Sequence, residues 1–414
     1  MNRQKRTFWN PRTESMVQYI LFAILVVATP FIVVTRYLQN AVHILSHLSF
    51  SVFGRDIPYI LIFGSIILLS LIFRYRKEIT WRRIKAILVI LIVILFAHKT
   101  QDLYTDMSFF DLQQNWHYIA YCAYVFFFFR AFNARKMSKN KMILYSFSSS
   151  LCMSTFDETF QFFMSNRIFD ISDINKDALG AVFGLILVLF VSETYGTISV
   201  KLKTILKKNL VDYFKDPLSS LMLVSLFTVA FLFTSPLLTE HEYWYLNLLT
   251  GFCLFLFLMS IIHFSQYLKI RYLIAGIALI TFISLSVSFA INFNKNIMYN
   301  SYGLTVYKGL PIPFFDIIIY QNGMIRLVDK KHHFRSNDRA YFFKQNPDIL
   351  LIGSGSEGAG GKGFDTAKGT YFIFNKFNLK GTQVIILPTP EAYKKFNQLK
   401  EKNKNVLFVI HNTC

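Results

Sequence analysis

The chain has 414 residues, of which 53% are hydrophobic and 17% aromatic, and its mean hydropathy is positive. A soluble globular protein rarely has this composition, so the sequence predicts an integral membrane protein. The net charge of +20 does not point to a nucleic-acid partner. Its basic residues are distributed as in membrane proteins, whose cytoplasmic loops are rich in Lys and Arg.

Nine segments are apolar enough to predict membrane-spanning helices, which need about 20 residues each. They cover residues 16–38, 57–74, 82–98, 116–133, 142–164, 178–196, 218–237, 244–265 and 271–292. Between the first two, the stretch "NAVHILSHLSFSVF" is typical of an amphipathic helix at the membrane interface. The predicted fold is a polytopic α-helical membrane bundle that ends in a C-terminal α/β domain.

The loops between these helices predict the orientation of the chain. If the N-terminus is cytoplasmic, the cytoplasmic segments carry 22 Lys and Arg, against 5 in the outer segments. This asymmetry is the positive-inside pattern, and nine spans then place the C-terminal domain outside the cytoplasm. The expected location is the cell membrane, and the expected first partner is the lipid bilayer.

The stretch "STFDETFQFFMSNR" places Asp157 and Glu158 side by side in the apolar segment 142–164. On a helix, Ser154 lies one turn before this pair and Gln161 one turn after it. Carboxylates inside a membrane are costly and usually mark functional sites or pathways. The alternative is that these polar groups only hold helices together.

The next stretch, "SNRIFDISDINKDALGAVFG", adds further polar groups. Asp173 is expected to cap the helix predicted at 178–196, with Asp177 on its first turn. Gly180 and Gly184 form a small-xxx-small pair, which lets another helix approach closely. The sequence predicts one outward-facing ligand-binding pocket, formed by His117, Asp157, Glu158, Gln161, Arg167, Asp173 and Asn175.

Over about residues 84–196 the sequence resembles the VanZ-like family of membrane proteins. The matching residues are Glu158, Gln161, Arg167, Asp173, Asn175, Gly180 and Gly184, with His117 from an earlier motif. Gln113 and Gln114 stand where that family usually has an Asp-Lys pair. The resemblance implies a role in the cell envelope and low-level resistance to the glycopeptide teicoplanin, but it does not supply a reaction.

From about residue 296 the pattern changes to that of a soluble α/β domain. "FDIIIYQNGMIRLVD" predicts a β-hairpin around an Asn-Gly turn. "PDILLIGSG", "TQVIILP" and "NVLFVIHNTC" predict three strands. "TPEAYKKFNQLKEK" predicts a helix with Thr389 as its N-cap and Pro390 at the next position. The order strand, helix, strand predicts a right-handed βαβ unit.

This region, about residues 303–414, resembles a small Mth-like α/β domain that also occurs in a mitochondrial complex I assembly factor. The matching stretches are "DIIIYQNGMI", "NPDILLIGSG", "LPTPEAYKKFN" and "FVIHNTC". The sequence therefore predicts four parts of the chain. They are N-terminal helices at 1–83, a VanZ-like domain at 84–196, additional spanning helices at 197–295 and the soluble domain at 296–414.

The loop "GSGSEGAGGKGFD" follows a predicted strand, the position at which phosphate-binding loops occur. It departs from the P-loop pattern, because Ser356 and Gly363 stand at two of its key positions. The stretch is therefore either a ligand site formed by Gly353, Gly355 and Lys362 or a flexible surface loop. His411 and Cys414 are interpreted as structural, so no metal site and no cofactor are expected.

Three functions are compatible with the sequence. The first is an envelope protein whose outward pocket binds an envelope component or a glycopeptide. The second is a proton- or ion-coupled transporter, which lacks the sequence signal of inverted repeats. The third is an intramembrane enzyme that uses Asp157 and Glu158. The sequence holds no nucleophile elbow and no HExxH motif, so catalytic residues are unknown and an enzyme is disfavoured.

Overall fold

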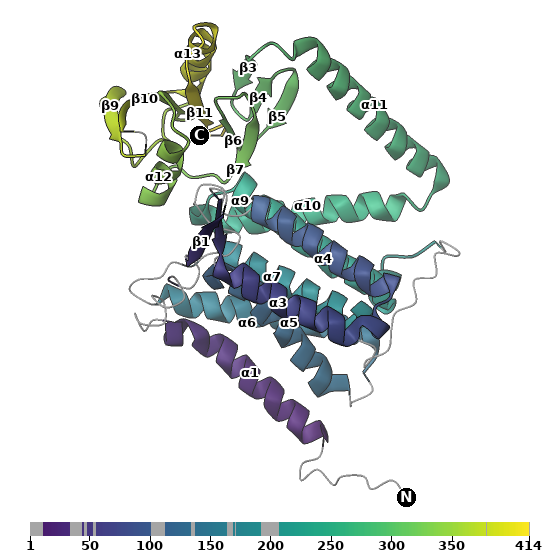
Figure 1. Cartoon of the computed structure of the whole chain (residues 1–414). Coiled ribbons are helices and arrows are strands. Elements are labelled where there is room, and N and C mark those ends of the chain that lie inside the picture. Colours follow the sequence, from purple (N-terminus) through teal and green to yellow (C-terminus); the bar gives the residue numbers. More distant parts are fainter. Residues whose placement is uncertain are drawn as a thin grey trace, which may run out of the picture. The chain divides into compact units, whose positions relative to one another are not determined.

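The structure is a computed structural model, and it describes residues 11–33, 44, 48–52, 55–100, 112–133, 137–163, 169, 171–191, 207–377 and 379–413 (Figure 1). The chain divides into two compact units. The first unit holds most of the chain up to Leu232, together with Leu254–Met259. The second unit holds Phe233–Cys253 and the chain from Ser260 onward.

Helices occupy each of the ranges predicted to span the membrane. They are α1 (Pro11–Val33), α3 (Tyr59–Tyr75), α4 (Trp81–Thr100), α5 (Leu112–Asn133), α6 (Lys139–Phe162), α7 (Ile171–Ile186), α9 (Pro217–Leu238), α10 (Trp244–Phe264) and α11 (Leu268–Asn292). Short helical pieces are η1 (Arg76–Glu78), η2 (Leu187–Val191), α8 (Asp212–Lys215) and η3 (His241–Tyr243).

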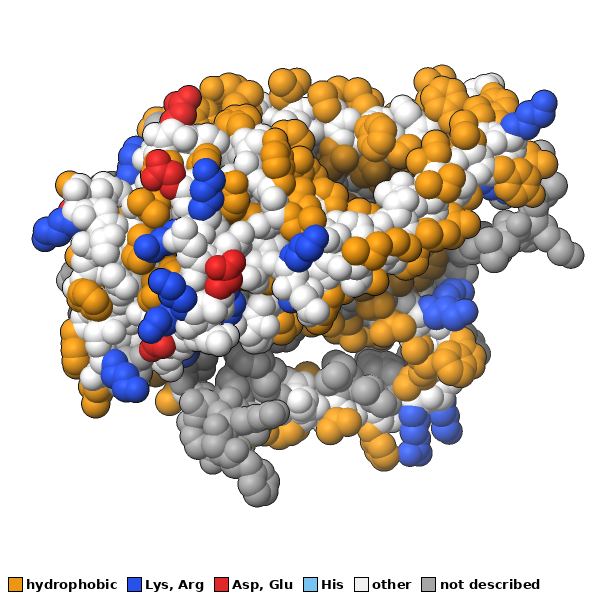
Figure 2. Space-filling view, turned by 90° about the horizontal axis from the view of Figure 1, so that it is seen from above, with side chains coloured by type: hydrophobic (Ala, Val, Ile, Leu, Met, Phe, Trp, Pro, Cys, Tyr) orange, Lys and Arg blue, Asp and Glu red, His pale blue; other side chains and the backbone are white. Residues whose placement is uncertain are grey.

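Four stretches of the described residues are long and apolar enough to cross a bilayer. They are Ile171–Val191, Pro217–Leu238, Trp244–Phe264 and Leu268–Asn292. No residue in the apolar window of the last stretch is fully buried by protein. Figure 2 shows many hydrophobic side chains on the visible surface. The chain is thus membrane-like in its helical part, whereas nine crossings stay a prediction.

Two sequence predictions about local structure were wrong. Within the expected interfacial helix, residues 49–52 form strand β1 (Ser49–Val52), which pairs with β2 (Arg55–Pro58) in an antiparallel hairpin. Helix α7 begins at Ile171, not at 178, so Asp173 lies in its first turn and is not its cap. The hydropathy pattern missed this start because it detects only the apolar part of a helix, and the first two turns of α7 are polar.

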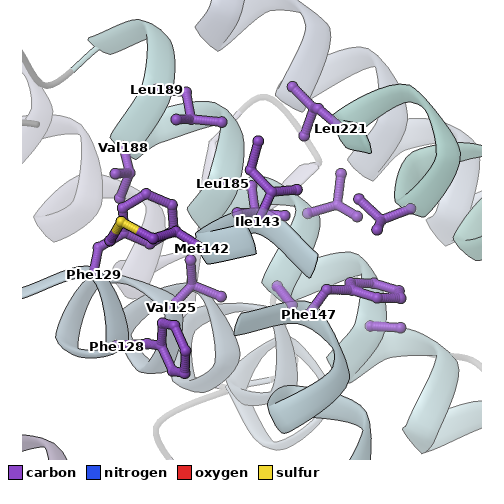
Figure 3. Close-up of a cluster of buried hydrophobic side chains, with 14 residues drawn as sticks. Val125, Phe128, Phe129, Met142, Ile143, Phe147, Leu185, Val188, Leu189 and Leu221 are labelled. Atoms are coloured by element: carbon purple, nitrogen blue, oxygen red, sulfur yellow. The ribbon is translucent and has the colours of Figure 1, made fainter. Parts of the chain in front are cut away.

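The core of the first unit lies where α5, α6, α7 and α9 meet (Figure 3). Val125, Phe129, Ile143, Leu185 and Leu189 are each at most 1% exposed there. These residues recur three and four positions apart on their helices, which places them on one face of each. This packing fixes the helices that carry the polar groups described below.

The C-terminal domain is built on a six-stranded sheet with the strand order β7-β6-β11-β8-β10-β9. Its strands are β6 (Asp316–Ile319), β7 (Ile325–Val328), β8 (Ile349–Gly353), β9 (Thr370–Asn375), β10 (Lys380–Leu387) and β11 (Val406–Ile410). Strands β10 and β11 both run parallel to β8 and flank it. The helices are α12 (Ser336–Lys344) and α13 (Thr389–Glu401), and α13 connects β10 to β11.

The predicted hairpin is confirmed, since β6 and β7 pair antiparallel and Gly323 has a φ of +78° in the turn. Two predictions in this domain need correction. A second sheet was missed, with β3 (Ile297–Ser301), β4 (Leu304–Tyr307) and β5 (Leu310–Pro313). Thr389 is not the N-cap of α13, because Pro388 holds that position. The Thr389 hydroxyl instead donates to the carbonyl of His411.

Within the second unit, the end of α9 is joined to the α/β domain. Leu237 lies in the same buried cluster as Ile318 and Leu350. The Lys330 amide donates to the Pro236 carbonyl at 3.0 Å. Glu240 accepts from the His332 amide at 2.6 Å and lies 2.5 Å from Nδ1 of the same residue.

The Glu240–His332 contact predicts a pH-dependent stability. The hydrogen bond to Glu240 raises the pKa of His332 above its ordinary value of about 6.5, while partial burial opposes the rise. A raised folded-state pKa means that the stabilisation is complete below about pH 6.5 and is lost as pH rises through the folded pKa. We expect Glu240→Gln to cost about 1 kcal/mol at pH 6 and much less at pH 9, as measured by thermal unfolding. An equal cost at both pH values would contradict this assignment.

Candidate functional site

A row of polar side chains follows the buried face of α6. Ser146, Ser150, Ser154, Glu158 and Gln161 are all at most 7% exposed. Their spacing of three or four residues places them on one side of the helix. The hydroxyls of Ser146 and Ser150 donate to carbonyls of α6 itself. These two serines are satisfied locally, whereas the residues further along the helix reach other side chains.

Asp177 joins α5, α6 and α7. Its Oδ2 accepts a hydrogen bond from the Ser154 hydroxyl at 2.6 Å. Its Oδ1 lies 2.8 Å from Nδ1 of His117. The Asp177 side chain is 1% exposed and the His117 side chain 19%. A buried carboxylate that contacts partners on two other helices fixes their register, because an unpaired charge there is costly.

A second carboxylate faces the same imidazole. Asp173 lies one helical turn before Asp177, and its Oδ2 is 3.8 Å from Nε2 of His117. The other oxygen of Asp173 accepts a hydrogen bond at 3.0 Å from Lys176, whose side chain is 4% exposed. His117 thus lies between two carboxylates with a buried ammonium group beside them.

Glu158 and Gln161 contact each other one turn apart on α6. The Gln161 amide donates to Oε1 of Glu158 at 2.6 Å, and Glu158 is fully buried. Its neighbour Asp157 is 7% exposed. Two adjacent buried carboxyl groups in a low-dielectric setting have a strong preference for hydrogen-bond donors and cations.

The two glycines of α7 lie against the backbone of α5. A Cβ atom at Gly180 would lie 2.8 Å from the carbonyl oxygen of Tyr118, and one at Gly184 would lie 2.7 Å from that of Cys122. This geometry supports the close approach expected from the small-xxx-small pair. The approach is what brings His117 of α5 next to Asp177 of α7.

The structure describes six of the seven predicted pocket residues, and among them Asp157 is 7% exposed next to Glu158. His117 lies with Asp173, and Glu158 lies with Gln161. Asn175 donates to the carbonyl of Phe231 in α9 at 3.4 Å, and Arg167 lies outside the described residues. Sequence reasoning missed Lys176 and gave Asp177 only a helix-start role. The spacing Asp173-x-x-x-Asp177, which places both carboxylates on one helix face, was the available signal.

The described residues contain no cluster of three or more His, Cys, Asp or Glu side chains suited to a metal ion. The loop residues Gly353, Gly355 and Lys362 belong to the second unit and are described with it below. We name the group of His117, Ser154, Glu158, Gln161, Asp173, Lys176 and Asp177 the polar cluster.

Apolar helices around a buried polar cluster define the class: a multi-helix membrane protein with charged groups inside its helical part. Residues 4–192 match the family model VanZ/LLP1, so this part of the chain is VanZ-like. That range contains the whole polar cluster and extends further toward the N-terminus than the resemblance noted from the motif.

Neither curated proteins nor solved structures extend this similarity. The chain matches no curated protein at a significant level. One solved structure, named "MT938", is 22% identical, with 29% of this chain and 98% of that chain covered and a TM-score of 0.23. A similarity at this TM-score does not establish a shared fold, so the Mth-like resemblance of the C-terminal domain stays a prediction.

Proposed function

We propose that the polar cluster is the functional centre of a VanZ-like cell-envelope protein and that it binds a polar envelope component or a glycopeptide of the teicoplanin type. The main support is the chain of contacts from Ser154 through Asp177 to His117, which joins three helices. Purely structural contact between helices does not need two carboxylates, an ammonium group and an imidazole together. Such groups are rare inside membranes and usually serve function.

Glu158 provides the direct test of this proposal. In a strain that lacks the protein, complementation with Glu158→Ala is expected to give no rescue in a drug and envelope-stress susceptibility profile, although the variant is inserted and folded. Glu158→Gln keeps a hydrogen-bonding group of similar size. It is expected to rescue better than Glu158→Ala if this carboxyl group acts in its neutral form.

A matched control is Thr159→Ala, since Thr159 lies next to Glu158 on the exposed face of α6 and its hydroxyl donates to the Thr155 carbonyl. This variant is expected to rescue fully. Loss of membrane-inserted protein in Glu158→Ala, with no specific phenotype, would instead support a purely structural role. Equal failure of Ala and Gln variants with normal insertion would indicate a required negative charge.

A second candidate function is proton-coupled transport. The observation that favours it is the position of His117 between Asp173 and Asp177, since alternating imidazole and carboxylate groups can relay protons. Proteoliposomes with an entrapped pH dye test it. Proton movement that is lost in His117→Gln would favour transport, whereas no movement in the wild type would leave the binding function.

For orientation, we propose a cytoplasmic N-terminus and an extracytoplasmic C-terminal domain. The support is the Lys and Arg asymmetry of the loops, and large domains cross membranes largely regardless of their own charge. Alkaline phosphatase fused after Cys414 is expected to be active. A fluorescent GFP fusion with no phosphatase activity would show that the number of crossings is even.

A further inference from the structure

The carboxyl ends of three parallel strands meet at one edge of the C-terminal sheet. Strands β8, β10 and β11 end there, in register at Gly353, Leu387 and Ile410. After β8 the chain forms β9 and β10 on one side of β8, and α13 then leads back to β11 on the other side of β8. In open α/β sheets, ligands bind outside the carboxyl ends of the strands where the order reverses in this way.

A buried carboxylate–imidazole pair lies at this edge. Nδ1 of His411 is 2.8 Å from Oδ2 of Asp316, and the two side chains are 0% and 1% exposed. The other oxygen of Asp316 accepts from the Asn412 amide at 2.8 Å. Asp316 therefore holds the ring orientation and directs the second ring nitrogen, Nε2, away from itself.

Nε2 of His411 has no hydrogen-bond partner among the described residues. A buried polar atom without a partner costs about 1–3 kcal/mol, so its presence at this strand edge calls for a reason. The ring edge that carries Nε2 faces the glycine-rich loop. A Cβ atom at Gly360 would lie 3.0 Å from Cδ2, the ring carbon bonded to Nε2.

The loop is held at both ends and exposed between them. The Gly355 amide donates to the Thr389 hydroxyl at 2.9 Å, and the Gly360 amide donates to the Ser354 carbonyl at 2.8 Å. Residues 357–359 between these ties are exposed. Gly355, Gly358 and Gly361 all have positive φ values. Glycines in this conformation let the loop turn sharply beside the strand end, as loops that bind anions do.

Basic residues surround the loop. The segment 330–335 reads Lys-Lys-His-His-Phe-Arg, and it pairs with the loop through the Lys362 amide, which donates to the His332 carbonyl at 3.0 Å. The imidazole of His332 lies 6.4 Å from that of His411 in a stacked arrangement. Lys331 and His332 are already paired with carboxylates. The positive charge beside the loop therefore comes from the exposed Lys362 and from Arg339, which donates to the Gly363 carbonyl, and it favours a negatively charged ligand.

We propose that His411, held by Asp316, and the loop 354–362 form a binding site for a small anion that carries a phosphate or carboxylate group. In the imidazolium form of His411, Nδ1 stays bonded to Asp316 and the N–H at Nε2 donates to the anion. The main-chain amides of the exposed residues 357–359 complete its coordination. The roles expected from the sequence change accordingly. Gly353 packs under Thr389, Gly355 ties the loop, and Lys362 acts through its main chain.

The test uses the full chain in detergent, with inorganic phosphate and acetate as separate probes, and measures binding by calorimetry and by the thermal shift on titration. His411→Gln is expected to weaken binding of the preferred probe at least about tenfold, the loss of one charge-assisted hydrogen bond. Lys404→Gln is the matched control and is expected to bind normally, because Lys404 is exposed and lies just before β11, at the opposite edge of the sheet.

A further variant covers the case in which His411→Gln does not fold. Gly360→Ala leaves Asp316 and His411 in place but puts a methyl group against Cδ2, so it is expected to reduce binding as well. In the wild type, ¹⁵N-labelled histidine is expected to show one Nε2 signal that shifts on addition of the probe. Binding of neither probe by the wild type, or equal binding by wild type and His411→Gln, would overturn the proposal.

Discussion

Gly184→Leu is expected to unfold the VanZ-like part of the chain or to prevent its assembly. A Cβ atom at this position would lie 2.7 Å from the Cys122 carbonyl oxygen and 2.8 Å from the Val125 Cβ. Both neighbours belong to α5, and a backbone oxygen cannot rotate away as a long side chain can. The helices must therefore separate, which moves His117 away from Asp177. The expected cost is about 3 kcal/mol, at the upper end of overpacking effects.

The measurement is thermal unfolding in detergent, together with the amount of protein inserted in the membrane. Gly276→Leu is the control, because Gly276 lies on the exposed helix α11 and a Cβ atom there would meet nothing within 4 Å. We expect this control to be neutral or slightly stabilising, since glycine inside a helix costs about 1 kcal/mol relative to alanine. If both variants behaved alike, close packing of α7 on α5 would not be what holds the site.

Asp177→Ala is expected to have the second large effect. It removes one carboxylate that serves two partners, the Ser154 hydroxyl at 2.6 Å and the His117 ring at 2.8 Å. Truncation of one member of a buried charged group typically costs about 3–5 kcal/mol, because its partners stay buried without compensation. We expect loss of function together with a clear drop in the unfolding temperature.

Asp177→Asn separates the two effects. The amide has the same shape, and its oxygen can still accept from Ser154, so the stability loss is expected to be smaller than with alanine. The negative charge beside His117 is gone, however, and the proposed function requires this charge. Full rescue of the deletion phenotype by Asp177→Asn would contradict the functional role of the pair and leave Asp177 as a structural contact.

Much of the architecture follows from the sequence alone, because it depends on local patterns. Long apolar runs predicted the helices, and the Asn-Gly turn predicted the β6–β7 hairpin. The same local patterns failed at the edges of elements. The polar start of α7 and the four-residue strands β4 and β5 carry too few residues for a periodic signal.

The sequence by itself determined the membrane class of the chain, its helical ranges and the presence of costly polar groups such as Glu158 inside them. Only the tertiary structure decided which of these groups meet. His117 and Asp177 are 60 residues apart in sequence, and Asp316 and His411 are 95 apart. The Gly180–Gly184 pair predicted that some helix approaches closely, and the strand–helix–strand order predicted parallel strands. Neither local pattern specifies which helix or which side chains meet, because that depends on how the elements pack.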